Sequence, residues 1–360
     1  KTNPRMIGRG SAVWNWYSVN TIIQYNQATS IRGILDSHGI HVDHHNENTF
    51  IQYNYMEDCE GGFVEILGDN ETAVYRFNIS VNDGWRENPN WVNSNHTIWL
   101  SNTIGGEAGH ESNNSFIYNN TVVVNRSSNP YRTAIDIRAN NTRIFNNIFY
   151  SINGSKIGGK QVRVEDDNLL VTNNLFHGNI DVRFKDLDEN GIYGDPSFYN
   201  EDLGGAKGFQ LLASSPAINS GVPYSGNYSH PSIPVNDSDI FNTVEAIPTK
   251  DFFGRSLTVN STPNIGANNA KNGEITTYNN APRLKNLFIR DKIEFNNIKY
   301  NYNYAVYDII GREMMRGALN NGNDQIALNS NLKNGVYEVV LENENIISSS
   351  KFILKNNSAL

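Results

Sequence analysis

A short phrase built around an asparagine recurs along the first half of the chain, and it constrains the fold more than any other feature. The phrase NTFIQYNYMED, which contains Asn54, lines up with ETAVYRFNISVND, which contains Asn78, after a shift of 24 residues. A self-similar period of this length is the sequence signature of a solenoid or a propeller. The six repeated asparagines are Asn26, Asn54, Asn78, Asn120, Asn147 and Asn174, spaced by 28, 24, 42, 27 and 27 residues.

The residues inside each copy indicate which solenoid this is. Each copy alternates apolar and polar residues, which is the period of a strand, and none has a helical stripe. Asparagine tolerates the left-handed conformation of a turn, and its amide can both donate to and accept from a stacked copy. A propeller blade needs roughly 40–50 residues, and the leucine framework of leucine-rich repeats is absent. The sequence therefore predicts an all-β fold, a right-handed parallel β-helix over residues 1–270.

Composition excludes several classes of partner. The net charge of -8 and the pI near 5.5 argue against nucleic acid, which is bound through Lys and Arg patches. No apolar run approaches the roughly 20 residues of a membrane-spanning helix. Cys59 is the only cysteine, so no internal disulfide can form, and we expect an inert structural thiol. We also expect a monomer. Since no signal peptide or end cap is visible, we interpret the chain as part of a longer protein or as a trimmed form.

The pattern changes in the second half of the chain. Residues 194–270, with GDPSF, FQLLASSPAINSG and DFFGR…NIGA, resemble the closing segment of many secreted bacterial β-helix proteins. Residues 271–280 have the composition of a linker. Residues 281–360 alternate like short strands with Gly and Asn turns, which predicts a small Ig-like β-sandwich.

The strands that precede the asparagine phrases predict which side chains face outward. The strands GIHVDHH, GFVEILG, HTIWLSN, TAIDIRA and QVRVEDD align so that apolar columns alternate with polar ones. Because successive strand residues point to opposite faces, the apolar columns enter the core and the others point out. Neighbouring coils are about 4.8 Å apart, so outward side chains of successive coils touch. The first outward column is His41, Glu65, Trp99, Asp136 and Arg163, and the second is Asp43, Leu67, Ser101, Arg138 and Glu165.

This face has two interpretations, and the sequence leaves both open. A purely structural ladder would pair its acids with its arginines across coils. A groove for an extended polysaccharide would instead use tryptophans as flat faces for sugar rings and acids or histidine as proton carriers. In the second interpretation the predicted catalytic residues are His41, Glu65 and Asp136, and the predicted substrate-binding residues are Asp43, Trp85, Arg86, Trp91, Trp99, Arg138 and Arg163.

The one long spacing predicts a single insertion, which we assign to residues 79–95. This stretch carries Trp85, Arg86 and Trp91. A long loop on a regular solenoid is usually functional because the repeat does not require it. We expect the loop to fold over the outward face and to wall a cleft floored by the first column. The alternative is that it packs on the opposite side and shields the core.

The sequence contains two candidate metal sites. His41, Asp43 and His45 share a strand face, and imidazoles with a carboxylate suit zinc or another transition metal. Calcium prefers several oxygen ligands and is the stronger candidate, because acidic residues gather in neighbouring turns. The predicted calcium ligands are Glu57, Asp58, Glu60 and Asp69. A solvated acidic turn is the alternative.

Two stretches of the chain resemble known families. VYDIIGRE, the GVY phrase at Gly335–Tyr337 and the closing KFILK resemble the C-terminal sorting domain of the type nine secretion system of Bacteroidetes. That resemblance implies an exported Gram-negative protein, secreted or at the cell surface, whose last domain is recognised by the secretion machinery. Residues 1–270, with HVDHHNENTFIQYNYMEDCEGGFVEILG and YRFNISVNDGW, resemble the secreted pectate-lyase-like β-helix proteins, a superfamily that includes polysaccharide lyases and glycoside hydrolases.

The expected function is degradation of an extended, acidic polysaccharide, with a lyase as the first reaction type and a hydrolase as the second. A lyase would use His41 or an arginine as base and arginines or Ca²⁺ to neutralise the uronate. A hydrolase would use Glu65 and Asp136, whose backbones lie roughly 9.6 Å apart, two strand spacings. Polygalacturonase, alginate lyase and chondroitinase motifs are not recognisable, so the alternative is a non-catalytic glycan-binding or surface-structural protein.

Overall fold

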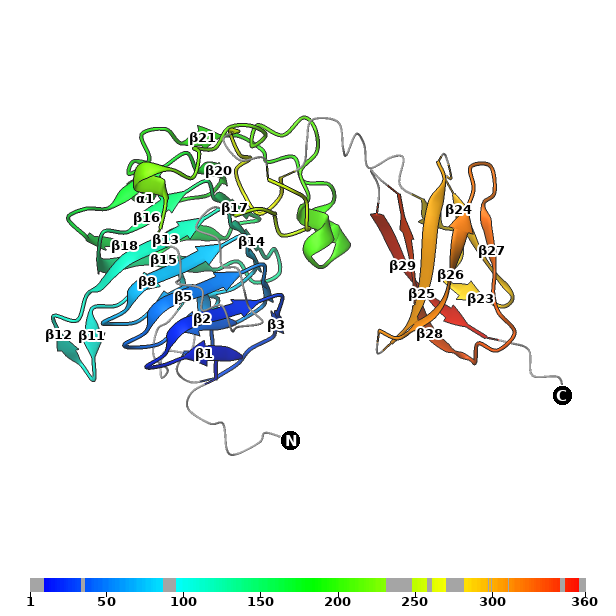
Figure 1. Cartoon of the computed structure of the whole chain (residues 1–360), viewed down its shortest axis with the longest axis horizontal. Helices are drawn as coiled ribbons and strands as arrows, with labels where there is room; N and C mark the ends of the chain where they lie inside the picture. The colour runs from blue at the N-terminus through cyan, green and yellow to red at the C-terminus, as the bar shows by residue number, and fades with distance from the viewer. Residues whose placement is uncertain are drawn as a thin grey trace, which may run out of the picture. The chain divides into compact units, whose positions relative to one another are not determined.

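The computed structural model describes residues 10–33, 36–86, 95–230, 248–257, 261–269, 282–296, 298, 300–309, 311–343 and 347–355. The chain divides into two compact units, Lys1–Lys271 and Asn272–Leu360 (Figure 1). The helices among these residues are single short turns, and none has the length and apolar character that a membrane crossing requires.

The first unit is a solenoid whose coils each place a short strand on three faces (Figure 1). The first face holds β1 (Val13–Asn15), β4 (Ile40–Val42), β7 (Gly62–Ile66), β10 (His96–Leu100), β15 (Arg132–Asn140) and β18 (Lys156–Glu165). The second holds β2 (Val19–Gln24), β5 (Glu47–Gln52), β8 (Glu71–Arg76), β13 (Ser112–Tyr118), β16 (Arg143–Phe145) and β19 (Leu170–Thr172). The third holds β3 (Gln27–Thr29), β6 (Tyr55–Glu57), β9 (Ile79–Val81), β14 (Thr121–Asn125), β17 (Ile148–Ile152), β20 (Leu175–Gly178) and β21 (Ile192–Tyr193).

Strands of successive coils pair in parallel on every face, in the register that the repeat predicts. On the first face Ile98 lies opposite both Val64 and Ile135, and Ile135 lies opposite Val162. Val64, Ile98 and Ile135 are fully buried in the main core cluster. The predicted apolar columns therefore do line the inside of the solenoid, where burial of apolar area is the main stabilising term.

The repeated asparagines form the predicted ladder at the turn between the second and third faces. In each of its five steps the Nδ2 group of one asparagine donates to Oδ1 of the next at 2.9–3.1 Å, from Asn26 to Asn174. The backbone N–H of the same residue donates to the same oxygen at 2.9–3.0 Å. The ladder ends at Asp188, whose Oδ2 accepts from Nδ2 of Asn174 at 2.8 Å. Each inner asparagine thus satisfies buried polar groups of two neighbouring coils.

The backbone role predicted for these asparagines is wrong. The left-handed residue of each turn is the one before, with φ of 58° at Tyr25, 56° at Tyr53 and 50° at Phe77. In the later coils the same position is held by Asn119, Asn146 and Asn173. A left-handed conformation costs a bulky residue about 1–2 kcal/mol. The turn is therefore held by the ladder and by packing, because a tyrosine or phenylalanine would not adopt it alone.

The 42-residue spacing comes from two excursions, so the predicted single insertion at residues 79–95 is wrong in its bounds. β9 is a regular strand that pairs with β6 and β14. The first excursion follows β9 and leads to β10, and residues 87–94 within it lie outside the described residues. The second joins β10 to β13 and contains the antiparallel hairpin of β11 (Thr103–Ile104) and β12 (Glu107–Ala108), which projects from the solenoid (Figure 1). The spacing between two repeats shows how many residues were added, but it does not show where in the coil they lie.

The segment after β20 covers two faces of the solenoid. It contains the short helix α1 (Val182–Lys185), then the 3-10 turns η1 (Glu201–Leu203), η2 (Ala206–Phe209) and η3 (Gly226–Tyr228). Phe209, Leu211 and Ile265 are buried against the third face. Tyr224 and Tyr228 pack against aromatic residues of the second face. None of the described residues of this segment lines the outer side of the first face around β4 and β7, so a site can be open there.

The second unit is a β-sandwich of two sheets. One sheet holds β22 (Arg283–Leu284), β24 (Lys292–Asn296) and β27 (Gln325–Ala327). The other holds β23 (Phe288–Ile289), β29 (Ile347–Leu354), β28 (Gly335–Glu342), β25 (Tyr302–Asp308) and β26 (Glu313–Leu319). A core of its own, with Ile293, Val306 and Phe352, lies between them. The predicted fold class, a parallel β-solenoid followed by a small β-sandwich, is confirmed.

Candidate functional site

The first outward column has the predicted register but is mostly closed to solvent. Glu65 lies opposite Trp99, Trp99 opposite Asp136, and Asp136 opposite Arg163. His41 lies opposite Trp14, which extends the column by one coil. The exposed fractions of Glu65, His41 and Asp136 are 0%, 2% and 6%. The three residues predicted to be catalytic therefore do not form the open floor that we expected.

Glu65 is covered by two histidines. Its Oε2 lies 2.7 Å from Nδ1 of His38 and 3.3 Å from Nδ1 of His41. His38 belongs to the long connection between β3 and β4, and Arg86 of the β9–β10 connection donates to the carbonyl of Asp36 beside it. The β3–β4 and β9–β10 connections thus meet over Glu65, which the regular repeat does not reveal. His38 is a member of this cluster that sequence reasoning missed.

The proton balance of this cluster is set by burial. Burial raises the pKa of Glu65 to about 8, and the opposing charge of His41 offsets only part of that shift. Burial also lowers the pKa of His38 to about 3. At neutral pH Glu65 is therefore a protonated acid next to an uncharged imidazole. A low-dielectric site favours the neutral form of both groups.

Trp99, Asp136 and Arg163, farther along the column, also contact neighbouring side chains of the protein. The Trp99 ring stacks on His96 with centroids 5.0 Å apart, and burial lowers the pKa of His96 to about 3. Asp136 accepts a hydrogen bond from Nε of Arg138 at 3.1 Å, although burial raises the pKa of Asp136 above its ordinary value. The exposed Arg163 binds Glu165 at 2.6 Å. Each of these arginines pairs with an acid two residues away on its own strand, whereas the structural interpretation expected pairs across coils.

The described part of the predicted wall packs inward. Trp85 lies against the main core cluster, and the guanidinium groups of Arg32 and Arg126 lie 4.7 and 4.8 Å from its ring centre. The Nε atom of Arg86 lies 3.8 Å from Glu60. Trp85 and Arg86 are thus parts of a packed turn, where sequence reasoning expected a sugar-binding wall. Trp91 lies outside the described residues.

An open cleft lies on the first face beside the buried cluster, around the second outward column. Its volume is about 630 Å³. Trp14, Trp16 and Tyr17 of the first described coil line one side, with exposed fractions of 51%, 60% and 64%. The remaining lining residues are Asp36, Asp43, His44, His45, Leu67, Ile104 and Gly105. The last two stand at the tip of the β11–β12 hairpin, which supplies a wall that sequence reasoning assigned to the other excursion.

Trp14, Trp16 and Tyr17 were missed, although a signal for them exists. Val13, Trp14 and Asn15 lie opposite Ile40, His41 and Val42, so VWNWY is one coil upstream of IHVDH in the same alignment. Extending both outward columns by one coil would have placed Trp14 beside His41 and Trp16 beside Asp43. Of the residues that were predicted for a site, Asp43 and His45 line this cleft, and His45 was predicted only as a metal ligand.

Asp43 connects the cleft with the buried cluster. Its Oδ2 lies 3.9 Å from Nε2 of His41, and its Oδ1 accepts from the backbone N–H of His44 at 2.8 Å. Burial opposes ionisation of Asp43, but the contacts with His41 and His44 lower its pKa below the ordinary value. The cleft therefore contains an ionised carboxylate, and the protonated Glu65 lies on the other side of His41.

The acidic residues predicted to bind calcium have partners within the protein. Asp58 binds Arg32 at 2.5 Å, and Asp69 lies 2.8 Å from Nδ1 of His110. Glu57 accepts from the hydroxyl of Tyr55, and Glu60 lies near Arg32 and Arg86. Across the described ranges no three His, Cys, Asp or Glu residues are grouped in a way that could hold a metal ion. Calcium binding, and a transition metal at His41, Asp43 and His45, stay predictions.

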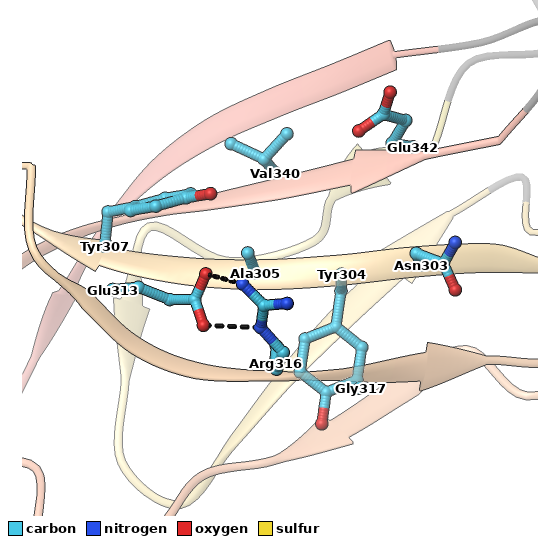
Figure 2. Close-up of a pocket in the computed structure, with 9 residues that line it drawn as sticks. All are labelled: Asn303, Tyr304, Ala305, Tyr307, Glu313, Arg316, Gly317, Val340 and Glu342. Carbon is cyan, nitrogen blue, oxygen red and sulfur yellow. Dashed lines mark hydrogen bonds and ion pairs between the residues drawn. The ribbon is translucent and has the colours of Figure 1, made fainter.

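The second unit has a smaller cavity of about 440 Å³ on its five-stranded sheet. Figure 2 shows Glu313 paired with Arg316 between Tyr304 and Tyr307. Two hydrogen bonds of 2.6 and 2.5 Å join the pair. Since Glu313 already engages the lining arginine, the larger cleft of the first unit is the better candidate for a ligand.

The comparisons with known proteins identify the second unit. Residues 285–355 match the family model described as the secretion system C-terminal sorting domain. The protein is therefore exported, to the medium or the cell surface of a Gram-negative bacterium of the Bacteroidetes, and this domain implies contact with the secretion machinery. No curated protein and no solved structure matches the chain. Kinship of the solenoid with the pectate-lyase-like superfamily stays a prediction.

Proposed function

We propose that this exported protein binds an extended glycan in the cleft of the first face. The observation that carries the proposal is the row of three exposed aromatic side chains, Trp14, Trp16 and Tyr17, along a polar cleft. An aromatic ring offers a flat apolar face to a sugar ring, while nearby polar groups can bind the hydroxyls. Asp43, His44 and His45 supply such groups.

The direction of the cleft also fits a polymer. Its lining residues come from three successive coils, at Trp16, Asp43 and Leu67, so a ligand can cross several strands. The hairpin tip at Ile104 stands on the same cleft. A chain of sugars would meet an aromatic surface first, then a carboxylate, then an apolar wall.

Hydrolysis of the bound glycan is a second candidate function. The observation that favours it is the pairing of an ionised carboxylate in the cleft, Asp43, with a protonated acid behind it, Glu65, joined through His41. Glycoside hydrolysis uses one carboxyl group as acid and another as base. Glu65 is buried, so Asp43 would contact the substrate and Glu65 would act only through His41.

A lyase, which was the first expectation from the sequence, has less support. That reaction needs a cation to neutralise the uronate carboxylate. Arg138 binds Asp136 and Asn102, and Arg163 binds Glu165, so both predicted arginines are engaged by neighbouring groups and Ca²⁺ is the remaining candidate for this role. Between the two reaction types the charges of the described residues favour hydrolysis.

Binding and turnover are tested separately on the full chain. Calorimetric titration with a panel of purified oligosaccharides should find a ligand whose affinity falls about tenfold or more in Trp16→Ala, which corresponds to loss of about 1.4 kcal/mol. Tyr193→Ala is the matched control, because Tyr193 is an exposed aromatic residue outside the cleft. A panel without any ligand, or equal effects of the two variants, would refute the proposal.

Turnover is measured on the same ligand. New reducing ends that disappear in Asp43→Asn would establish hydrolysis, and ultraviolet absorbance of an unsaturated sugar would establish a lyase. Binding without either signal would leave the non-catalytic function.

A further inference from the structure

We propose that the cleft selects glycans that carry free amino groups, with the Asp43 carboxylate receiving the ammonium group and the tryptophans receiving the sugar rings. This inference rests on the proposed function, since it names the chemical class of the glycan that the same cleft binds. It differs from the acidic polysaccharide expected from the sequence.

The charges around the cleft support this selection. Its described lining contains two aspartates, Asp36 and Asp43, and neither lysine nor arginine. Burial lowers the pKa of His44, which favours the uncharged form of this lining histidine. The net charge of the whole chain is also negative, at -8. A polyuronate would bring further carboxylates to a negative surface, where like charges oppose binding.

The aromatic residues reinforce the preference for a cation. The face of an indole or phenol ring attracts an ammonium group, at about 0.5–1 kcal/mol for exposed sites. Trp14, Trp16 and Tyr17 expose half or more of their surface beside Asp43. Aromatic faces next to a carboxylate form an environment that suits an amine better than it suits an acetamide or a carboxylate.

An unused polar atom points to the same position. His41 is 2% exposed, and among the described residues its Nε2 atom makes no hydrogen bond. Oδ2 of Asp43 lies 3.9 Å from this atom. The ring is fixed from the other side, because its Nδ1 atom lies 2.7 Å from the hydroxyl of Ser11. This nitrogen lies behind the Asp43 carboxylate inside the protein, and the contact with His41 helps to keep that carboxylate ionised for an ammonium group.

The test compares three hexasaccharides of equal length on the full chain, by calorimetry at a mildly acidic pH at which sugar amines are protonated. They are the β-1,4-linked hexamers of glucosamine and N-acetylglucosamine, and a hexamer of galacturonic acid. We expect the glucosamine hexamer to bind about tenfold more tightly than the N-acetylated one, and this advantage to shrink as salt is raised. We expect the galacturonic acid hexamer to bind most weakly.

Substitutions test whether Asp43 is responsible for the preference for free amino groups. Asp43→Asn should reduce affinity for the glucosamine hexamer about tenfold and leave affinity for the N-acetylated hexamer within about twofold. Glu165→Gln is the control, because Glu165 is an outward carboxylate on the same face that pairs with Arg163 away from the cleft. It should change neither affinity.

The outcomes separate this inference from the proposed function. Equal or tighter binding of the galacturonic acid hexamer, or equal loss for both amino sugars in Asp43→Asn, overturns the selection of amines while glycan binding stands. If no hexamer binds and Trp16→Ala has no phenotype on the wider panel, the proposed function falls as well.

Discussion

The asparagine ladder and the outward column both run along the length of the solenoid, yet they treat polar groups in opposite ways. The ladder repeats one neutral side chain in every coil, and each amide donates to the next coil and accepts from the previous one. The column changes residue at every coil, from Trp14 through His41, Glu65 and Trp99 to Asp136. Several of its buried atoms, such as both carboxylate oxygens of Glu65, lack hydrogen bonds of good geometry among the described residues.

This difference separates residues that stabilise the fold from residues that the fold does not require. A satisfied, uncharged ladder stabilises stacking and is reproduced wherever the coil recurs. A buried acid between two histidines costs stability, because desolvation of ionisable groups is unfavourable. A protein retains such a cluster for specificity or chemistry more readily than for stability.

Breaking the ladder should have the largest effect. Asn120→Ala removes the acceptor of the Asn78 side chain and backbone N–H and the donor to the Tyr75 carbonyl, all of them buried. We expect loss of about 3–5 kcal/mol in the free energy of unfolding. Urea unfolding followed by tryptophan fluorescence measures it, because all five tryptophans lie in the first unit. Asn26→Ala, at the exposed end of the ladder, should cost no more than about 1 kcal/mol. Equal losses would mean that the ladder does not carry the stacking.

Removing the buried acid should change how stability depends on pH. The pKa of Glu65 is about 8 in the folded chain and 4.5 in the unfolded one, so between these values the folded state holds one more proton. Its contribution to stability is therefore complete below about pH 4.5 and is lost as the pH rises towards 8. Relative to Glu65→Gln, the unchanged protein should lose up to about 1.4 kcal/mol per pH unit in that window.

The same urea titrations at several pH values provide this measurement. His38 has its pKa lowered by burial, so its own contribution is lost as the pH falls from 6.5 to about 3, which is the opposite direction. Because His38 contacts Glu65 directly, the substitution also changes the surroundings of His38. The two proteins are therefore compared between about pH 7 and pH 8, above the pKa of His38 in both the folded and the unfolded state. Parallel curves for the two proteins would show that Glu65 is ionised at neutral pH.

The smallest effect is expected at the solvent-exposed end of the outward column. Arg163→Ala removes the ion pair with Glu165, and both side chains are about half exposed. Exposed pairs contribute little because water and salt screen them, so we expect a change below about 0.5 kcal/mol in urea unfolding. A larger loss would place Arg163 with the structural ladder and remove the contrast between the two.

The fold was predictable because its signal is repeated. Six copies of one phrase fix the period, the strand register and the inward columns, so Val64, Ile98 and Ile135 could be placed without coordinates. The site was less predictable because it depends on the excursions, which occur once. His38 and the hairpin tip at Ile104 reach the first face through connections that do not recur in the other described coils.

The burial of outward-facing residues was the second property that could not be predicted from the sequence. Alternation along a strand identifies the side that a residue takes, and Glu65 and His41 do lie on the outward side. Whether that side is open depends on what covers it, and alternation contains no information on this. Trp85 shows the same limit, since its place beside Arg32 and Arg126 follows from the turn geometry of three different coils.

Asp188 sets the length of the asparagine ladder. An asparagine passes the hydrogen bond on to the next coil, whereas Asp188 accepts at both of its carboxyl oxygens, so the chain of amides that includes Asn26 stops at Asp188. The coils between Asn26 and Asp188 are therefore joined by one repeated hydrogen-bonding pattern, and Asp188 ends it. A duplicated coil inserted between Asn120 and Asn147 would meet the same donor and acceptor at both junctions, so the number of coils is a variable that an engineer could change without redesigning the ends.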